Sequence, residues 1–304
     1  MGSGDLVATA SVGIRRPAFA ARWGRALAPY FLVFPGAGWL AVFFLFPLFT
    51  LAITSLMSGD FIAGFVFTWN IGNYAYGLNL YAPQYLHSLE FGGSATLIAF
   101  LLAYPAAYWI AFHAGPRKSA YLLIVLLPFF VSFVLRTLSW ETLMGDDGPI
   151  LSPLKSAHIL PPDFRILATP VAVTFGLAYT FFPYMLLPIY ASLEKIDRRL
   201  VEAAEDLFAN KVEVFRRVIF PLSIPGVFAG VLLTGIPATA DFVNQVLLGG
   251  VGTTMIGRVI EQQFVANTNY PLAAALAFVF MLGLLAMLIA YQRLFGTEEL
   301  MRAR

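Results

Sequence analysis

Apart from Arg293 at the end of the last run, three charged side chains fall within long apolar runs, where a charge is expensive and usually has a function. Arg136 and Glu141 flank Trp140 in one run, and Asp241 lies in another. Carboxylates beside an aromatic face attract cations, so Asp241 and Glu141, with Trp140 or Tyr179, would suit a water-filled path for a positively charged solute. The alternative is structural, with Arg136 and Asp241 pairing to neutralise each other. The sequence leaves both interpretations open.

No constellation of residues points to catalysis. The three histidines, His87, His113 and His158, have no metal-ligand partner one helical turn away, and the chain has no cysteine. The segment 252–259 imitates a phosphate-binding loop, but Arg258 stands where lysine is required and Val259 where serine or threonine is required. We therefore predict no catalytic residue, no metal site and no cofactor bound by this chain.

The composition places the residues named above inside a membrane. The chain is 59% hydrophobic and only 12% charged, against roughly 25% charged in soluble domains. Six apolar runs are long enough to cross a bilayer, and they lack the alternation of barrel strands. The runs are Tyr30–Leu56, Gly92–His113, Ser119–Glu141, Ala168–Ala191, Leu222–Leu248 and Leu272–Leu294. The predicted fold class is an all-α membrane protein with six transmembrane helices.

Lysine and arginine predict the orientation, because short cytoplasmic loops accumulate them. Fifteen of these residues fall on one side of the predicted helices and three on the other, with Arg136 inside a run. We expect a basic cytoplasmic tail at 1–29, a six-helix domain at 30–294 and a cytoplasmic tail at 295–304. The twin arginines Arg15 and Arg16 precede an apolar run too long for a signal peptide, so we expect an uncleaved first helix.

A polar island, Ser192–Pro221, interrupts the apolar runs and carries six of the 19 lysine and arginine residues. Its pattern predicts two short amphipathic helices, one over Glu194–Leu207 with its apolar residues on one face, and one over Lys211–Ile219 that ends at Pro221. Such a hairpin at the inner membrane surface can lie on lipid or dock into a partner. These physical arguments do not choose between the two.

The island also carries a motif. The stretch Glu202-Ala203-Ala204, followed by Asp206-Leu207, Ala209 and Phe215-Arg216-Arg217, resembles the EAA loop of bacterial ABC-importer permease subunits. In that family the loop is the coupling helix that seats in a cleft of the cytoplasmic ATPase. One departure is Phe208, where the family usually has glycine. If this position requires a left-handed turn, phenylalanine costs about 1–2 kcal/mol there.

Further stretches resemble the spermidine/putrescine type of these permeases. They are Val134–Trp140, Ile236-Pro237-Ala238 leading to Asp241-Phe242-Val243, Leu247–Gly250, Met255–Gly257, Gln263-Phe264 and Tyr270–Leu276. Leu138, Ser139 and Arg258 depart from the pattern. The resemblance covers most of residues 30 to 295, with its specific motifs in the last two thirds.

The resemblance implies a type I importer permease in a bacterial inner membrane. Its expected partners are a dimer of cytoplasmic ABC ATPases, which bind ATP and Mg²⁺, a second permease subunit, an extracytoplasmic substrate-binding protein and membrane lipid, but no nucleic acid. The coupling residues carried over are Glu202, Ala203, Ala204, Asp206, Leu207, Phe208 and Ala209. The expected substrate is a polyamine. The alternatives are another small solute in the same architecture, a standalone secondary carrier and, less favoured, a membrane enzyme.

Overall fold

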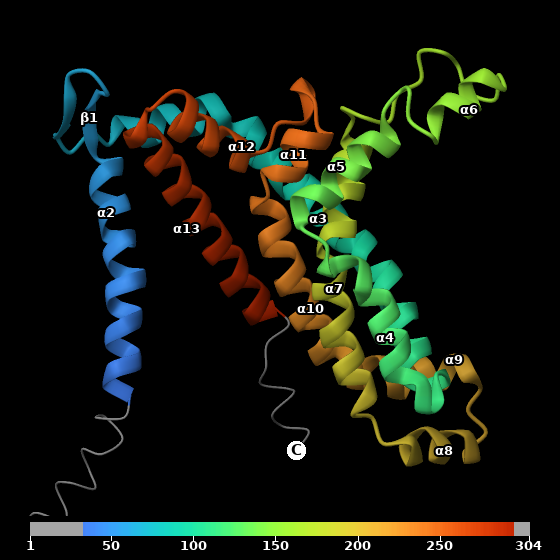
Figure 1. Ribbon diagram of the computed structural model, residues 1–304. Coiled ribbons are helices and arrows are strands. Elements are labelled where there is room, and N and C mark those ends of the chain that lie inside the picture. Colours follow the sequence, from blue (N-terminus) through green and yellow to red (C-terminus); the bar gives the residue numbers. More distant parts are fainter. Residues whose placement is uncertain (1–32, 295–304) are drawn as a thin grey trace, which may run out of the picture. The chain divides into compact units, whose positions relative to one another are not determined.

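The computed structural model describes residues 33–294, and Figure 1 follows the chain through them. The predicted tails at 1–29 and 295–304 lie outside the described residues. The chain divides into two units at Leu51, which are described separately below. The described part of the first unit belongs to one apolar helical run, Val33–Ser55, which contains the π-helical segment η1 (Ala41–Leu45) and α2 (Phe46–Ser55).

Five helical runs in the described residues are long and apolar enough to cross a membrane, and a sixth candidate is a bent pair. Besides Val33–Ser55 these are α3 (Gly72–His113), α7 (Pro170–Glu194), the run Lys211–Ala240 and α13 (Tyr270–Leu294). The bent pair is Gly115–Phe130 and Phe133–Met144, with 84° between its halves. The predicted helical membrane fold is confirmed, whereas the cytoplasmic location of both termini stays a prediction.

The bent pair contains η2 (Gly115–Arg117), α4 (Lys118–Leu126) and η3 (Leu127–Phe130), followed by α5 (Phe133–Met144). Pro128 lies in η3, beside the break. Proline lacks the amide hydrogen that would continue the helix, and its ring crowds the preceding turn. The predicted third run is therefore two short helices that meet at an angle.

Two predicted boundaries are wrong. The second run begins at Gly72 and not at Gly92, because α3 continues through a kink at Tyr81 into a polar first turn. The fifth run does not continue to Leu248: α10 (Phe220–Ala240) ends before Asp241, and α11 (Val243–Leu248) is a separate helix. Extended backbone at Asp241, with φ −66° and ψ 132°, separates the two helices.

The connections contain structure that the sequence pattern did not reveal. An antiparallel hairpin joins β1 (Met57–Asp60) to β2 (Gly64–Phe67), with Met57 opposite Phe67, so the fold is not wholly α-helical. The loop 142–167 contains a short helix, α6 (Leu151–Ser156). Before α13 the chain forms η5 (Val251–Thr253), α12 (Ile256–Glu261) and η6 (Gln262–Ala266).

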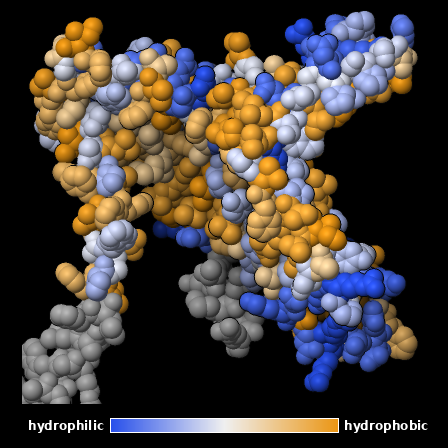
Figure 2. All heavy atoms as spheres, viewed as in Figure 1, coloured by the Kyte–Doolittle hydropathy of each residue, from blue (hydrophilic) through white to orange (hydrophobic). Residues whose placement is uncertain are grey.

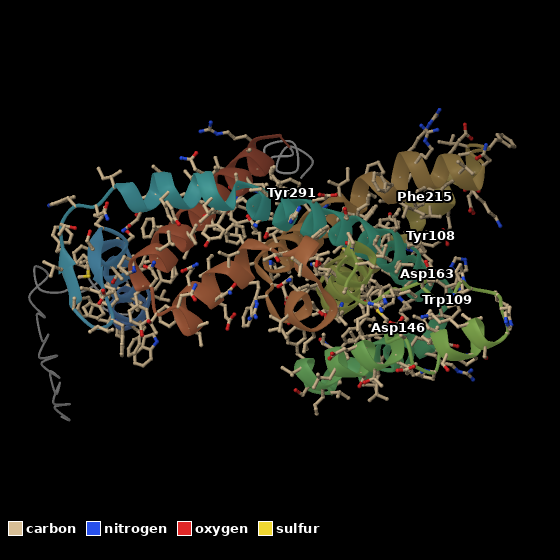
Figure 3. The ribbon with its side chains drawn as sticks, turned by 90° about the horizontal axis from the view of Figure 1, so that it is seen from above. Tyr108, Trp109, Asp146, Asp163, Phe215 and Tyr291 are labelled. Carbon is tan, nitrogen blue, oxygen red and sulfur yellow. The ribbon has the colours of Figure 1, made fainter. Side chains whose placement is uncertain are left out.

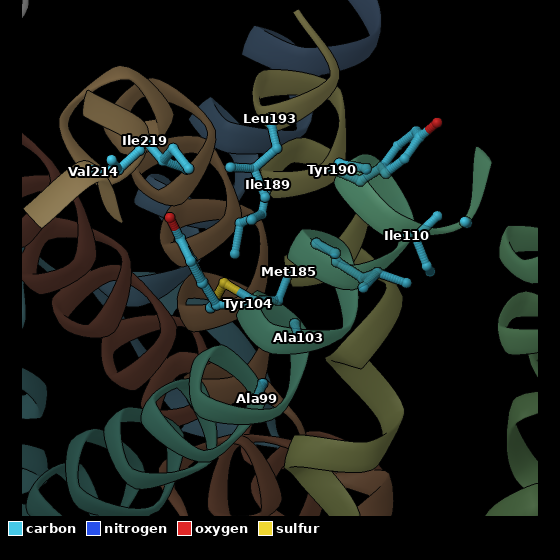
Figure 4. Packing of buried hydrophobic residues seen from close by; sticks show 14 residues of the cluster. Ala99, Ala103, Tyr104, Ile110, Met185, Ile189, Tyr190, Leu193, Val214 and Ile219 are labelled. Atoms are coloured by element: carbon cyan, nitrogen blue, oxygen red, sulfur yellow. The ribbon is translucent and has the colours of Figure 1, made fainter. Parts of the chain in front are cut away.

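Small residues let three long helices, α3, α7 and α10, pack closely. Ala95, Ala99, Ala103 and Ala107 recur every four residues along α3 and are fully buried. On α10, Gly226 and Gly230 lie against α7, and a Cβ atom at Gly230 would be 2.8 Å from the Met185 sulfur. These two glycines form a G-x-x-x-G pair, which lets the two helices approach closely. Figure 4 shows part of this core, in which Met185 and Ile189 face the α3 alanines.

Candidate functional site

The polar island lies at the end of the second unit opposite α6 and α12, and its two helices are α8 (Arg198–Asp206) and α9 (Lys211–Val214) (Figure 1). Hydrophilic residues gather there and around α6, with hydrophobic surface between them (Figure 2). Asp197 begins α8, because its side chain accepts a hydrogen bond from the Arg199 amide at 3.0 Å. The first predicted helix, Glu194–Leu207, is thus two pieces, since α7 includes Glu194.

The second predicted helix does not stop at Pro221. Asn210 and Glu213 form a capping box that begins α9. The π-helical segment η4 (Phe215–Ile219) follows and leads without interruption into α10, so that residues 211–240 form one helical run. Pro221 lies in the first turn of α10, beyond the π-helical segment, where proline does not break an α-helical interior. The island is therefore joined rigidly to a transmembrane helix.

Phe215, part of the motif, fixes this junction to α3. Its ring packs edge-on against Tyr104 and Tyr108, with centroids 5.8 Å and 6.0 Å away. Figure 3 labels Tyr108 and Phe215, which approach each other from α3 and from the island. The Tyr104 hydroxyl also shares a hydrogen bond with the Ser223 hydroxyl on α10, at 2.8 Å. Aromatic and polar contacts together fix the base of the island to the bundle.

A left-handed turn at Phe208 ends α8. The Ala209 amide donates to the Ala204 carbonyl at 3.1 Å, and the Phe208 amide donates to the Glu205 carbonyl at 2.9 Å. This is the Schellman arrangement, whose left-handed residue is usually glycine. Phe208 has a φ of +61°, so this position does require the left-handed turn considered from the sequence. The phenylalanine backbone is therefore strained by about 1–2 kcal/mol. The Phe208 side chain is 97% exposed.

The apolar residues of α8 recur at helical spacing, as predicted, and lie together on one broad side of the helix. Val201 and Ala204 pack against the core cluster of the bundle. Leu200, Ala203 and Leu207 are exposed, and Leu207 is 81% exposed. One edge of this apolar side therefore contacts the bundle, while the adjacent edge is left uncovered within the described residues. The motif residues Glu202 and Asp206 are also exposed, and neither makes an ion pair within residues 33–294.

The structure does not bring Arg136 and Asp241 into an ion pair. The Arg136 guanidinium lies 4.8 Å from the centre of the Phe129 ring and 5.7 Å from that of Tyr179. Its Nε is buried without a hydrogen-bond partner, and Nη1 reaches only the Pro128 and Val131 carbonyls at 3.5 Å. Arg136 is therefore held chiefly by aromatic faces, across the break between η3 and α5.

Trp140 completes this aromatic group. Its ring meets those of Phe175 and Tyr179 edge-on, with centroids 4.9 Å and 5.1 Å away. Beside it lies a cavity of about 370 Å³, lined by aromatic residues that include Phe129, Phe175, Tyr179 and Phe182. Three predicted pathway residues, Arg136, Trp140 and Tyr179, are thus brought together, while Glu141 is half-buried one position further along α5.

Asp241 belongs to a second polar group. Its carboxylate accepts a hydrogen bond from the Asn244 amide at 2.7 Å, and so caps α11. The Asn244 side-chain oxygen in turn accepts from the hydroxyls of Thr137 on α5 and Thr180 on α7, both at 3.4 Å. Since Thr137 follows Arg136 in α5, one helix links the two groups. None of these three polar residues was predicted as a site residue, although polar side chains within apolar runs often indicate a functional site.

The cations predicted on the external side are paired with carboxylates. Asp146 contacts the Lys155 amine at 2.9 Å and the Arg165 guanidinium at 3.1 Å. The hydrogen bond from Lys155, reinforced by the charge of Arg165, lowers the pKa of Asp146. Arg258, which departs from the family pattern, pairs with Glu261. Within residues 33–294 no group of three or more His, Asp or Glu side chains is placed to hold a metal ion.

These features define a membrane protein with several spans, a rigid polar loop that presents apolar side chains outward and a polar break inside the bundle. Comparison with known sequences identifies the family. The family described as "Binding-protein-dependent transport system inner membrane component" matches residues 97–295. The chain belongs to this family of ABC-importer permeases, so it is a non-catalytic component of an inner-membrane transporter. Its partner classes are an ATPase and a substrate-binding protein.

Relatives with known names cover most of the chain. The spermidine/putrescine transport system permease protein PotB of Haemophilus influenzae is 37% identical over 240 residues, which is 79% of this chain and 84% of PotB. PotB of Escherichia coli K12 is 34% identical over 257 residues, covering 84% and 94%. The inner membrane ABC transporter permease protein YdcU, also from Escherichia coli K12, is 30% identical and covers 70% and 72%.

The fold is similar to that of a solved transporter. A chain in the crystal structure of a bacterial ABC transporter involved in the import of the acidic polysaccharide alginate matches with a TM-score of 0.73. The match covers 91% of this chain and 98% of that chain at 16% identity. At this identity the likeness establishes the importer permease fold and says nothing of the substrate.

Proposed function

We propose that this chain is the permease subunit of an ATP-driven importer of polyamines such as spermidine and putrescine. The observation that carries the proposal is the identity of 34–37% with permeases named for these substrates, over 79% to 84% of the chain. Polyamines are flexible polycations. Carboxylates and aromatic faces are the groups that hold such a solute in a low-dielectric path.

The proposed path includes Asp241, Glu141, Trp140 and Tyr179. Asp241 stands where α10 ends, so its carboxylate lies at a gap in the helical backbone and not within a closed helix. One of its oxygens caps α11. We propose that the same carboxylate also receives an ammonium group of the substrate. Trp140 and Tyr179 offer ring faces and edges beside the aromatic cavity.

We further propose that α8 is the coupling helix, oriented to the cytoplasm together with both termini. ATP and Mg²⁺ would be bound by the ATPase subunits and not by this chain. Closure of the ATPase dimer would push on Glu202–Ala209, and the continuous helix 211–240 would carry the movement to Asp241. A second permease subunit would complete the path. In this scheme nucleotide binding shifts the population between inward- and outward-facing states.

The test is reconstitution. The tagged chain is purified from its native membranes with the subunits that accompany it, placed in proteoliposomes and supplied with its binding protein, ATP and radiolabelled spermidine. We expect ATP-dependent uptake and spermidine-stimulated ATP hydrolysis. If the same assembly forms but neither spermidine nor putrescine is taken up or stimulates ATP hydrolysis, the proposed substrate is wrong and the importer architecture still holds. Uptake by the isolated chain without ATP would favour the standalone carrier instead.

A further inference from the structure

The end of α8 combines two unfavourable features that do nothing for the fold of this chain. Phe208 adopts a φ of +61°, a conformation in which its Cβ atom is crowded and glycine would be relaxed. Its ring is 97% exposed and makes no aromatic contact within residues 33–294. Neither backbone geometry nor packing inside this chain therefore favours phenylalanine over glycine here.

The exposed ring does not stand alone. Leu207, which precedes it, is 81% exposed, and Leu200 and Ala203 extend an apolar stripe along the outward side of α8. Val201 and Ala204, on the adjacent edge of the same apolar side, already pack on the bundle. The Schellman hydrogen bonds hold the backbone on both sides of Phe208 and so fix the direction of its Cα–Cβ bond. A fixed, exposed aromatic residue beside an exposed leucine is typical of an anchor in a protein interface.

Charge distinguishes a protein partner from lipid. Glu202, Glu205 and Asp206 are all exposed on the last two turns of α8, beside Phe208. The negative end of the helix dipole lies at the same place. The cytoplasmic leaflet carries anionic lipids, which would repel this end. An apolar pocket rimmed by lysine or arginine side chains would accept both the ring and the carboxylates.

We propose that Phe208, supported by Leu207, is an anchor that inserts into an apolar, basic-rimmed pocket on the ATPase subunit. This inference rests on the proposed function, since it assumes that α8 faces an ATPase. The strained turn directs the Phe208 side chain away from the bundle, where it is accessible to a partner. Glycine at position 208 would therefore relax the loop and weaken the complex, two effects of opposite sign.

The experiment titrates the purified ATPase onto the permease assembly in nanodiscs. Phe208→Gly removes both the strain and the ring, whereas Phe208→Ala removes the ring and keeps the strain. Both are expected to weaken ATPase binding by about tenfold or more, as the loss of an interface anchor does. Only Phe208→Gly is expected to raise the unfolding temperature of the permease assembly. Val212→Ala is the control, because Val212 is apolar and 64% exposed but lies in ordinary helical geometry in α9.

Wild-type affinity in both Phe208 variants would overturn the anchor. Glu202→Ala separates this failure from a failure of the proposed function: if it weakens binding while Phe208→Gly does not, α8 still docks and only the anchor is wrong. No ATPase binding by the wild-type assembly would overturn both. Phe208→Trp tests whether this side chain inserts into lipid instead of the ATPase. The fluorescence of the wild-type assembly, whose permease chain has five tryptophans, is subtracted as background. Quenching of its added fluorescence by brominated lipids before ATPase is present would also refute the proposal.

Discussion

Asp241 caps α11, and we propose that its charge also serves substrate transport; three variants distinguish these two roles. Its carboxylate accepts a hydrogen bond from the Asn244 amide at 2.7 Å and so begins α11. Asparagine is about as good a cap as aspartate, whereas alanine at a capping position costs about 0.5–2 kcal/mol. Asp241→Asn should therefore leave the assembly and its unfolding temperature close to wild type, and Asp241→Ala should lower that temperature.

The charge role predicts a different ordering for transport. A hydrogen bond between a carboxylate and an ammonium group contributes roughly 1.5–3 kcal/mol, which corresponds to roughly 10- to 150-fold in rate or affinity. Spermidine uptake by Asp241→Asn should therefore show a loss of kcat/KM in that range, at an unchanged yield of the complex. Asp241→Glu, which keeps the charge on a longer side chain, should recover part of the loss.

The measurement is ATP-dependent uptake of radiolabelled spermidine into proteoliposomes, over a range of binding-protein and substrate concentrations. Basal ATP hydrolysis serves as the control for assembly. Normal uptake by Asp241→Asn would refute the reasoning and remove Asp241 from the path. Impaired uptake in Asp241→Ala alone would show that the carboxylate serves only as a cap.

Three further outcomes are expected. Glu202→Ala should reduce substrate-stimulated ATP hydrolysis while the isolated ATPase stays active, and full stimulation would contradict the docking role of α8. Gly230→Ala should destabilise the assembly by about 1–3 kcal/mol in thermal or denaturant unfolding, because its added methyl group overlaps α7; the matched control is Gly283→Ala, where no atom lies within 4 Å of an added Cβ. The pKa of Asp146 is lowered by Lys155, so the stabilisation that this pair gives its loop is present above the ordinary carboxyl pKa and lost as pH falls through the lowered value. The protection factors for hydrogen exchange in that loop, which correct for the intrinsic exchange rate, should therefore fall at acid pH, and Asp146→Asn should remove the step.

The sequence predicted the bundle because bilayer thickness and backbone hydrogen bonding leave few options for an apolar run of about 20 residues. It did not predict where such runs break. By hydropathy the run through Asp241 is continuous. In the structure, however, the Asp241 carboxylate accepts a hydrogen bond from the Asn244 amide and begins a new helix. Pro221 reads as a stop, yet the π-helical segment before it continues into α10. Local hydrogen bonds decided both cases, and hydropathy does not record them.

The site was predictable where a single residue carries the information, and less so where partners must meet. Phe208 was recognised from one departure in a motif, because a left-handed turn penalises any side chain. The partners of Arg136 were not predicted. Its charge suggested a pair with Asp241, whereas in the fold the Arg136 guanidinium lies over the rings of Phe129 and Tyr179. Aromatic residues are so frequent in this chain, at 15%, that no pattern marks the two that contact the guanidinium.

Under the proposed coupling role of α8, the continuous helical run 211–240 would act as a lever arm. At 1.5 Å per residue its 30 residues extend about 45 Å. A tilt of roughly 10° about one end would therefore displace the other end by about 8 Å, more than the diameter of an extended polyamine chain. Phe215, clasped between Tyr104 and Tyr108, stands near the base of this arm and supplies a pivot. A small rocking of α8 is thus geometrically sufficient to open or close a passage beside Asp241, without any change in secondary structure along the way.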